Sequence, residues 1–244
     1  MATAKQHYDS HLADLYSWMA GDFDSKQKEF QQFLKEQDVL PESVKIAVDL
    51  GAGHGIQSVA LAKMGFKVKA IDFSCQLLDE LRINGKGLNI EIIVDDIRSI
   101  APYTDPKPGV IVCWGDTITH LDDLADVEQF LVNCCTALAQ NGKLILSFRD
   151  YSTELTGDSR FIPVKSDENR ILTCIFEYSA DHVRVTDLLY KKHGHEWKQK
   201  VSSYQKVRIP VSFVRDCLGE NGMEIIFEGE VNRLTAIIAA KNKV

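Results

Sequence analysis

The chain has 244 residues, of which 45% are hydrophobic and 26% are charged, and its net charge is −7. This length suits one large domain with a sizeable core and makes two full domains less expected. The acidic balance argues against a nucleic-acid partner, since that affinity comes largely from neutralising phosphates, and it favours a small-molecule substrate.

The sequence also predicts a cytoplasmic protein that needs no membrane. Its apolar runs all fall short of the roughly 18 residues that a membrane-spanning helix requires, and the first residues lack the basic start and apolar core of a signal peptide. Six cysteines are scattered without a CxxC pair, mostly in apolar runs such as VIVCWG. We expect them to be buried free thiols rather than disulfides or metal ligands.

The first 150 residues alternate between helical and strand-like segments. Two N-terminal segments, 9–20 and 23–38, have helical periodicity. Short apolar runs then predict buried parallel strands, and the segments between them predict helices that cover both faces of a sheet. The expected strands are 44–50, 66–73, 89–96, 108–115 and 143–150, and the expected helices are 55–65, 75–84 and 122–140.

After Asp150 the pattern changes to three alternating runs separated by SADH and HGHEW, which predicts an antiparallel meander. A helix and a closing antiparallel strand pair, MEIIFEGE with LTAIIAAK, are expected to follow. Because no linker rich in proline or glycine flanks the meander, we expect a single domain over 1–244. Its expected parts are helices over the site at 1–40, a cofactor-binding core at 41–150, an insertion acting as lid or interface at 160–209, and the closing elements at 210–244.

The stretch VDLGAGHGIQ places Gly51, Gly53 and Gly55 on the turn after the first predicted strand. In open parallel sheets, ligands bind beyond the carboxyl ends of the strands, where this turn lies. The nicotinamide fingerprint G-x-G-x-x-G is incomplete, because Ile56 occupies its third glycine position. An ordinary tight turn is the alternative explanation of the glycines.

The next three predicted strands also end in residues that suit a nucleoside. Asp72 can accept hydrogen bonds from both hydroxyls of a ribose, and such bonds to a charged acceptor are worth about 1.5–3 kcal/mol each before desolvation is counted. Asp96 and the backbone of Ile97 can read an adenine edge, and Trp114 offers an aromatic wall. Acidic residues at strand ends also commonly cap helices, but the set together describes an adenosine pocket.

The ordered series DLGAGHG, AIDFS, VDDIRSI and VCWGDTITHL resembles the motifs of class I S-adenosylmethionine-dependent methyltransferases. The resemblance implies an α/β fold, with a doubly wound, mostly parallel seven-stranded sheet whose last strand is antiparallel, and S-adenosylmethionine as cofactor. It places Asp72 on the ribose, Phe73 beside the adenine and Asp49 behind the glycine loop, which it orients. The cofactor site that it implies comprises Tyr16, Trp18, Asp49, Gly51, Ala52, Gly53, Gly55, Asp72, Phe73, Asp96, Ile97, Trp114 and Gly115.

Two further stretches are similar to glycine N-methyltransferases: GDTITHL to their G-N-S-x-A-H-L, and SFRDYS to their D-H-R-N-Y-D. The likeness makes Arg149 an anchor for a substrate carboxylate, with a surface salt bridge as the alternative. It makes His120 and Asp116 candidates for accepting the acceptor's proton, whereas His120 otherwise serves as a helix-entry residue. Asp116 stands where the family has asparagine, and an anion there would repel a carboxylate, so that glycine itself is doubtful as substrate.

The stretch YSWM, with Tyr8 ahead of it, would form an aromatic lid in such enzymes, and Tyr8 would contact the substrate. Tyr16 and Trp18 equally suit simple packing of a helix face. The expected function is methyl transfer to a small-molecule acceptor, with N-methylation narrowly favoured. The alternatives are a nicotinamide-dependent oxidoreductase and a non-catalytic protein that binds S-adenosylmethionine. No metal is expected, since His193-Gly194-His195 suits a hairpin turn.

Overall fold

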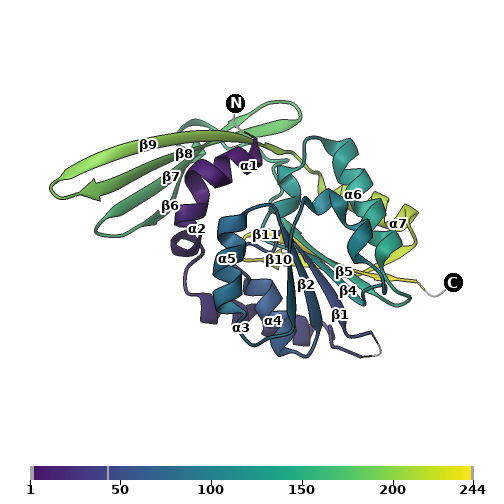
Figure 1. Cartoon of the computed structure of the whole chain (residues 1–244). Helices are drawn as coiled ribbons and strands as arrows, with labels where there is room; N and C mark the ends of the chain where they lie inside the picture. The colour runs from purple at the N-terminus through teal and green to yellow at the C-terminus, as the bar shows by residue number, and fades with distance from the viewer. Residues whose placement is uncertain (1–2, 43, 243–244) are drawn as a thin grey trace.

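The computed structural model describes residues 3–42 and 44–242. They form a seven-stranded sheet flanked by helices and a separate four-stranded sheet, with the N-terminal helices beneath the latter (Figure 1). This arrangement leaves three groups of elements around one end of the larger sheet: its own strand ends, the N-terminal helices and the smaller sheet.

The larger sheet has the strand order β10-β11-β5-β4-β1-β2-β3. Strands β1 to β5 are parallel, and β11 pairs antiparallel with both β5 and β10. The predicted seven-stranded sheet with its antiparallel last strand is therefore confirmed. The strands are β1 (Ile46–Leu50), β2 (Lys67–Asp72), β3 (Ile90–Val94), β4 (Val110–Cys113), β5 (Lys143–Phe148), β10 (Met223–Val231) and β11 (Leu234–Lys241).

Helices cover both faces of this sheet, as the apolar runs predicted (Figure 1). On one face, Phe30 and Leu61 pack against the strands, while Val127 and Leu131 do so on the other. Side-chain caps start several of these helices; Ser74, for example, accepts a bond from the third residue of α5. The helices are α3 (Phe23–Glu36), α4 (Ile56–Lys63) and α5 (Cys75–Asn84) on the first face, and α6 (Leu124–Ala137) and α7 (Val211–Glu220) on the second.

Short 3-10 turns follow β3 and β4, and the turn after β4 precedes α6. They are η2 (Ile97–Ser99), η3 (Ala101–Tyr103) and η4 (Thr117–His120). A fourth, η5 (Gly157–Arg160), precedes the smaller sheet. η2 and η4 begin within a few residues of the ends of β3 and β4, so the side chains of these turns stay near the sheet edge.

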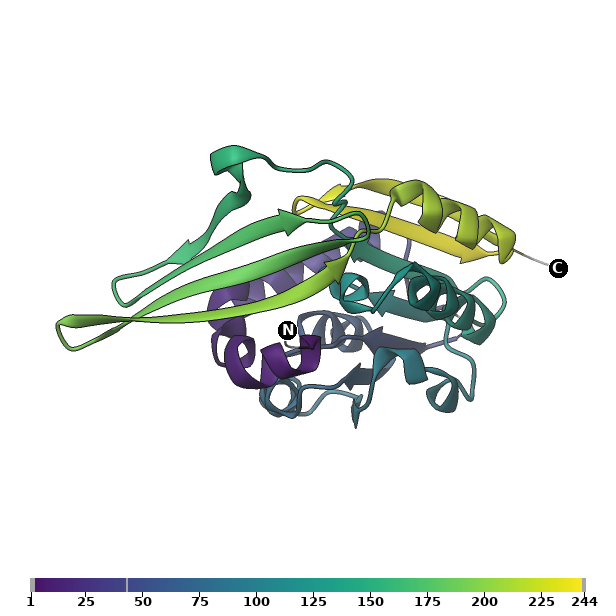
Figure 2. The ribbon, with the colours of Figure 1, turned by 90° about the horizontal axis from the view of Figure 1, so that it is seen from above.

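The smaller sheet is antiparallel and consists of β6 (Phe161–Ser166), β7 (Arg170–Tyr178), β8 (His182–His193) and β9 (Glu196–Val207). The last three confirm the predicted meander. β6 was missed because its largely exposed residues, Pro163 among them, give no burial alternation. The β8–β9 hairpin extends beyond the rest of the chain (Figure 2), and Gly194 with His195 forms its turn.

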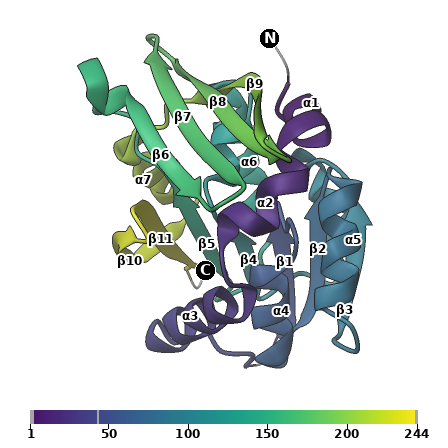
Figure 3. The same ribbon diagram turned by 90° about the vertical axis from the view of Figure 1, so that its left-hand side faces the viewer.

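The N-terminal helix starts earlier than expected, because α1 (Ala4–His7), a π-helical turn η1 (Tyr8–Leu12) and α2 (Ala13–Ala20) follow one another without a break. Leu15 on α2 packs against Leu172 and Leu189 of the smaller sheet. Helix α2 therefore lies between the smaller sheet and the core (Figure 3). Single π-helical turns occur often at functional sites.

The cysteines are free thiols, as predicted, but they are not all buried. Four of them are buried, Cys174 is half-buried, and Cys75 at the start of α5 is exposed. Within the described parts of the chain, every helix is too short or too polar to cross a membrane.

Candidate active site

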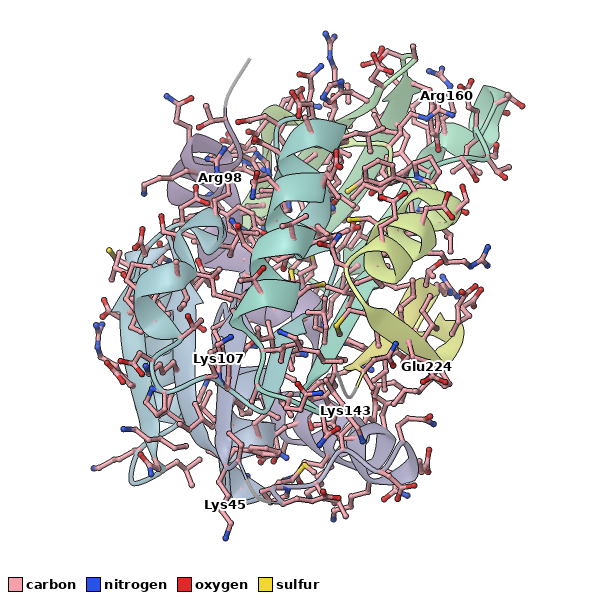
Figure 4. The ribbon with its side chains drawn as sticks, turned by 90° about the vertical axis from the view of Figure 1, so that its right-hand side faces the viewer. Lys45, Arg98, Lys107, Lys143, Arg160 and Glu224 are labelled. Carbon is pink, nitrogen blue, oxygen red and sulfur yellow. The ribbon has the colours of Figure 1, made fainter. Side chains whose placement is uncertain are left out.

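A cavity of about 500 Å³ opens at the carboxyl ends of the parallel strands. Figure 4 shows Arg98, from the loop after β3, at this end of the molecule, and Lys45, Lys107 and Lys143 toward the opposite end. Residues at the ends of four successive strands, residues of the N-terminal segment and Leu77 of α5 line the cavity. They are Thr3, Lys5, Tyr8, Tyr16, Gly51, Gly53, Asp72, Phe73, Leu77, Val94, Asp95, Asp96, Ile97, Arg98, Thr117, His120, Leu121 and Asp122.

The glycine turn lets a ligand approach the backbone between β1 and α4. Gly51 and Gly53 line the cavity and adopt left-handed conformations, with φ of +75° and +52°. A Cβ at Gly51 would lie 2.3 Å from Thr117 Cγ2, so only glycine fits there. The turn thus needs glycine at position 51 both for its left-handed backbone and for the lack of space beside Thr117. Without side chains at Gly51 and Gly53, its backbone is exposed to the cavity.

Asp72, at the end of β2, both holds this turn and faces the cavity. Its Oδ2 accepts a hydrogen bond from the Gly53 amide at 2.8 Å, and its Oδ1 accepts one from the Ser74 amide at 2.8 Å. Burial raises the pKa of Asp72, and the backbone N–H groups oppose that rise. Each carboxylate oxygen still has a lone pair for a ligand hydroxyl.

The loop after β3 contributes a rim of paired charges. Asp96 accepts bonds from the backbone and guanidinium of Arg98, which also reaches Asp122 and Asp126. Burial raises the pKa of Asp96, but the Arg98 bonds outweigh it and lower that pKa. Asp95, which directly precedes Asp96, also lines the cavity and accepts a bond from the Tyr103 hydroxyl at 2.6 Å.

The N-terminal helices close the cavity with two tyrosines. The Tyr8 ring makes edge contacts with Phe73, at 5.6 Å between centroids, and with His120, at 5.6 Å. The Tyr16 ring lies over the glycine turn, 3.5 Å from where a Cβ of Gly53 would be. Trp18 does not belong to this cover: its ring lies against Arg170, at 4.4 Å, under the smaller sheet. One helix cannot present both Tyr16 and Trp18 to the same side, because positions two apart lie on different faces.

Trp114 and Gly115 do not form a wall of this cavity either. Trp114 packs against Phe30 and Phe33, with centroids 5.0 and 5.3 Å apart. Together with Ala52 and Gly115 these rings line a smaller cavity of about 260 Å³ on the other side of the glycine turn. Among the residues that the structure describes, Gly51 and Tyr16 are the two that line both cavities.

Two further predicted residues lie behind the site rather than in it. Asp49 accepts a bond from Ser58 of α4 at 2.5 Å, so it ties β1 to that helix, and Asp72 holds the glycine turn instead. Burial raises the pKa of Asp49 to about 7. Gly55 caps α4 at φ +100° and allows close packing, since a Cβ there would lie 2.1 Å from Leu81 Cδ1.

His120 ends the η4 turn and lines the cavity. Its Nδ1 is buried and has no hydrogen-bond partner among residues 3–42 and 44–242. Its ring stacks on Tyr204, with centroids 5.5 Å apart. Burial and the nearby Lys206 ammonium lower the pKa of His120 to about 3. The imidazole is therefore neutral near pH 7.

Asp116 does not face the cavity, contrary to the expectation of a proton acceptor there. It is buried, pairs with the Lys206 ammonium, and accepts bonds from the Arg149 amide at 2.8 Å and the Tyr151 hydroxyl at 3.1 Å. Burial raises the pKa of Asp116, but Lys206 and these donors outweigh it and lower that pKa. Its charge is thus neutralised by Lys206, so it is not the free anion that would repel a substrate carboxylate.

Arg149 follows β5, half-buried and outside the lining of the cavity. The expected alternative was a salt bridge, but within the described chain its guanidinium makes no ion pair. Its charge acts on Tyr151 and Cys174 instead. The guanidinium is therefore free for a ligand that reaches under the smaller sheet.

The inward face of β9 was not predicted from the sequence. Tyr204 and Lys206 are buried among the surrounding elements, although the strand is otherwise largely polar and exposed. The signal was present as a period of two, because Ser202, Tyr204 and Lys206 alternate. Nothing in the local pattern showed which face was buried.

The cavity fits a nucleoside that bears a charged sulfur. Its glycine turn has no room for a Cβ at Gly51, the buried carboxylate of Asp72 suits a diol, and Phe73 and Ile97 offer apolar contact. Tyr8 and Tyr16 cover the side next to the glycine turn. These groups could hold S-adenosylmethionine.

Comparison with known proteins agrees with this geometry. Residues 47–142 match the family model described as a methyltransferase domain. Glycine/sarcosine N-methyltransferase of Halorhodospira halochloris is 30% identical over 132 residues, covering 53% of this chain and 49% of that protein. The same enzyme of Aphanothece halophytica is 27% identical over 140 residues, covering 57% and 51%. The chain thus spans about half the length of the curated relatives it matches.

Among solved structures, an S-adenosylmethionine-dependent methyltransferase from Clostridium acetobutylicum superposes with a TM-score of 0.75. The alignment covers 97% of this chain and 99% of the other at 16% identity, so it shows a shared fold. Over residues 47–142 the chain is therefore similar to methyltransferase domains, and its fold is shared with an S-adenosylmethionine-dependent methyltransferase. Its sequence is also similar to glycine/sarcosine N-methyltransferases.

Proposed function

We propose that this protein transfers a methyl group from S-adenosylmethionine to a small-molecule amine. The observation that carries the proposal is Asp72: a buried carboxylate, tied to the Gly53 amide, that faces a cavity large enough for a nucleoside. When bound, S-adenosylmethionine supplies a methyl group already activated by a positively charged sulfur. The chain itself then has to bind, orient and keep out water, a positioning role worth about 7–11 kcal/mol in favourable cases.

Each part of the cavity has a distinct task in this proposal. Asp72 binds the ribose hydroxyls, and Phe73 and Ile97 contact the adenine. Gly51 and Gly53 give close access to the backbone, and Tyr8 and Tyr16 cover the reacting end. The insertion at 160–209 works as a lid of the same functional unit, because Leu172 and Leu189 pack on α2.

His120 serves as a hydrogen-bond acceptor and not as a strong base. A pKa of about 3 leaves its imidazole neutral near pH 7, so it can accept a bond from the acceptor's N–H. The same pKa makes it a poor proton store, because a general base works best when its pKa lies near the working pH. The amine therefore has to bind in its unprotonated form. The methylated ammonium that forms then loses one proton to solvent.

An amino-acid-like acceptor is the class that the residues favour. The guanidinium of Arg149 is unpaired within the described chain and suits a carboxylate. With Asp116 neutralised by Lys206, the expected repulsion of a carboxylate disappears. The relatives named for glycine and sarcosine N-methylation support an amine acceptor. We further propose action in the cytoplasm on a small molecule rather than on nucleic acid, because all the cysteines are free and the net charge is −7.

Two measurements test the function. Calorimetry should show binding of S-adenosylhomocysteine and no binding of NADH, which would identify the cofactor class. An assay for released S-adenosylhomocysteine should then show methylation of glycine, sarcosine or related amino acids, with the amide glycinamide as a matched acceptor that lacks the carboxylate. Arg149→Ala should raise KM for the acids at least tenfold and leave KM for glycinamide within twofold. Binding without turnover of any acceptor would instead support a non-catalytic protein.

A further inference from the structure

Strand β9 presents three polar residues, each two positions from the next, toward the site. Ser202, Tyr204 and Lys206 alternate along the strand, so their side chains share one face. Ser202 Oγ bonds His7 Nδ1 at 2.7 Å, and the ring of Tyr204 stacks on His7 with centroids 4.1 Å apart. Lys206 pairs with Asp116. One strand of the smaller sheet thus contacts both the N-terminal helix and the turn after β4.

Asp116 connects β9 to the site, because it pairs with Lys206 and directly precedes the η4 turn. Its carboxylate forms a salt bridge with the Lys206 ammonium. Its backbone carbonyl accepts hydrogen bonds from Thr119 N at 3.3 Å and Thr119 Oγ1 at 2.7 Å. Asp116 also has a left-handed backbone, with φ of +74°. A non-glycine residue stays in that conformation only where its surroundings hold it. Lys206 is a major part of those surroundings.

The turn held in this way carries His120 as its last residue. The His120 ring lies between Tyr204 of β9 and Tyr8 of η1, at centroid distances of 5.5 and 5.6 Å. The charged or titratable groups that act on it are Lys206 from β9, Asp116 from its own turn and His7 from α1. Both the position and the charge surroundings of the imidazole therefore depend on β9.

We propose that Lys206 is a positioning residue: by pairing with Asp116 it locks the η4 turn against β9 and so fixes the His120 imidazole at the cofactor cavity. The proposal rests on the methyl transfer proposed above, in which His120 orients the acceptor. Lys206 touches neither cavity, so it acts only through Asp116 and His120. Through Lys206, the smaller sheet both covers the site and positions His120 in it.

Four variants of the full chain test this role. Lys206→Met removes the tie and leaves the buried Asp116 carboxylate without its cationic partner, which destabilises a fold strongly. Asp116→Asn/Lys206→Met removes both charges, so it relieves that destabilisation without restoring the tie to β9. Lys206→Arg keeps a cation in place. Lys198→Met, on an exposed part of the same strand, is the matched control.

Three readouts separate positioning from structural support: the affinity for S-adenosylhomocysteine, kcat and KM for the acceptor, and the NMR signal of the His120 ring across pH. We expect Lys206→Met and the double variant to keep that affinity within twofold, to lose kcat at least tenfold, and to shift the His120 signal. Lys206→Arg should retain kcat within threefold, and Lys198→Met should match the wild type.

A double variant that folds stably and has wild-type kcat and an unshifted His120 signal would overturn the proposal, because it would show that Lys206 only neutralises a buried charge. This holds even if Lys206→Met does not fold. If no amine is methylated by the wild type, the proposed function fails, but the His120 signal of the double variant still decides the role of Lys206.

Discussion

The Asp72 carboxylate accepts a hydrogen bond from the Gly53 amide across 2.8 Å, so the end of β2 holds the turn that follows β1. One side chain therefore shapes the glycine turn and presents the acceptor for a ribose. This double role makes Asp72 the residue on which the cavity depends most, and it leads to the first prediction.

Asp72→Ala should weaken binding of S-adenosylhomocysteine at least 30-fold, about 2 kcal/mol, because it removes a charged acceptor and releases the turn. Asp72→Asn keeps the shape and one acceptor oxygen, so its loss should be intermediate. Calorimetry on both variants checks this order. An affinity within twofold of wild type in Asp72→Ala would refute the ribose assignment.

Gly51→Ala should impair both stability and cofactor binding. Gly51 and Gly87 have almost the same left-handed φ, +75° and +80°, but only Gly51 has a neighbour where the Cβ would go. Gly87→Ala should therefore cost only the conformational strain, roughly 1–2 kcal/mol, and leave affinity unchanged. Gly51→Ala should cost more in urea unfolding and lose S-adenosylhomocysteine affinity at least tenfold. Equal effects of the two substitutions would contradict the contact with Thr117.

Tyr16→Ala and Trp18→Ala should separate the cavity cover from the helix packing. Tyr16 lies over the glycine turn, whereas Trp18 contacts Arg170 and Lys165 outside the cavity. We expect Tyr16→Ala to weaken S-adenosylhomocysteine binding at least fivefold and Trp18→Ala to stay within twofold, as measured by calorimetry. Loss of affinity in Trp18→Ala alone would restore Trp18 to the cofactor site.

Two buried histidines should make the fold sensitive to acid. Burial, against the opposing Asp187 carboxylate, lowers the pKa of His11 to about 4, and burial with Lys206 lowers that of His120 to about 3. Unfolded histidine titrates near 6.5, so the unfolded state binds protons first. The contribution of these two histidines to the free energy of unfolding is fully present above pH 6.5. It decreases as the pH drops toward 4, by up to about 1.4 kcal/mol per pH unit for each histidine.

Urea unfolding at several pH values checks this dependence. His11→Gln should reduce the slope between pH 6.5 and 4, because it removes one titrating group. His195→Gln, on the exposed hairpin turn, is the matched control and should leave the slope unchanged. A slope between pH 6.5 and 4 that is the same in His11→Gln as in the wild type would show that His11 accepts a proton in the folded state.

The parts of the site that lie close to strand ends were predictable. Gly51, Gly53, Asp72, Asp96 and Ile97 line the cavity, as the strand and turn pattern indicated, and Phe73 lines it as the family resemblance implied. Each follows its strand within a few residues, so the direction of the parallel strands brings it to the shared edge. Tyr8 and Tyr16 also reach the cavity, although their placement required the N-terminal helix to fold back over the sheet.

The sequence alone determined the order of strands and helices, the glycine turn and the acidic residues that end β2 and β3, because local periodicity and turn chemistry act over a few neighbouring residues. Only the tertiary structure decided that Trp114 packs away from the cavity and that Trp18 lies under the smaller sheet. It also decided that Asp116 is neutralised by Lys206, which lies 90 positions after it in the chain. The physical reason is that charge pairing and burial depend on which distant elements meet, and no local pattern records that meeting.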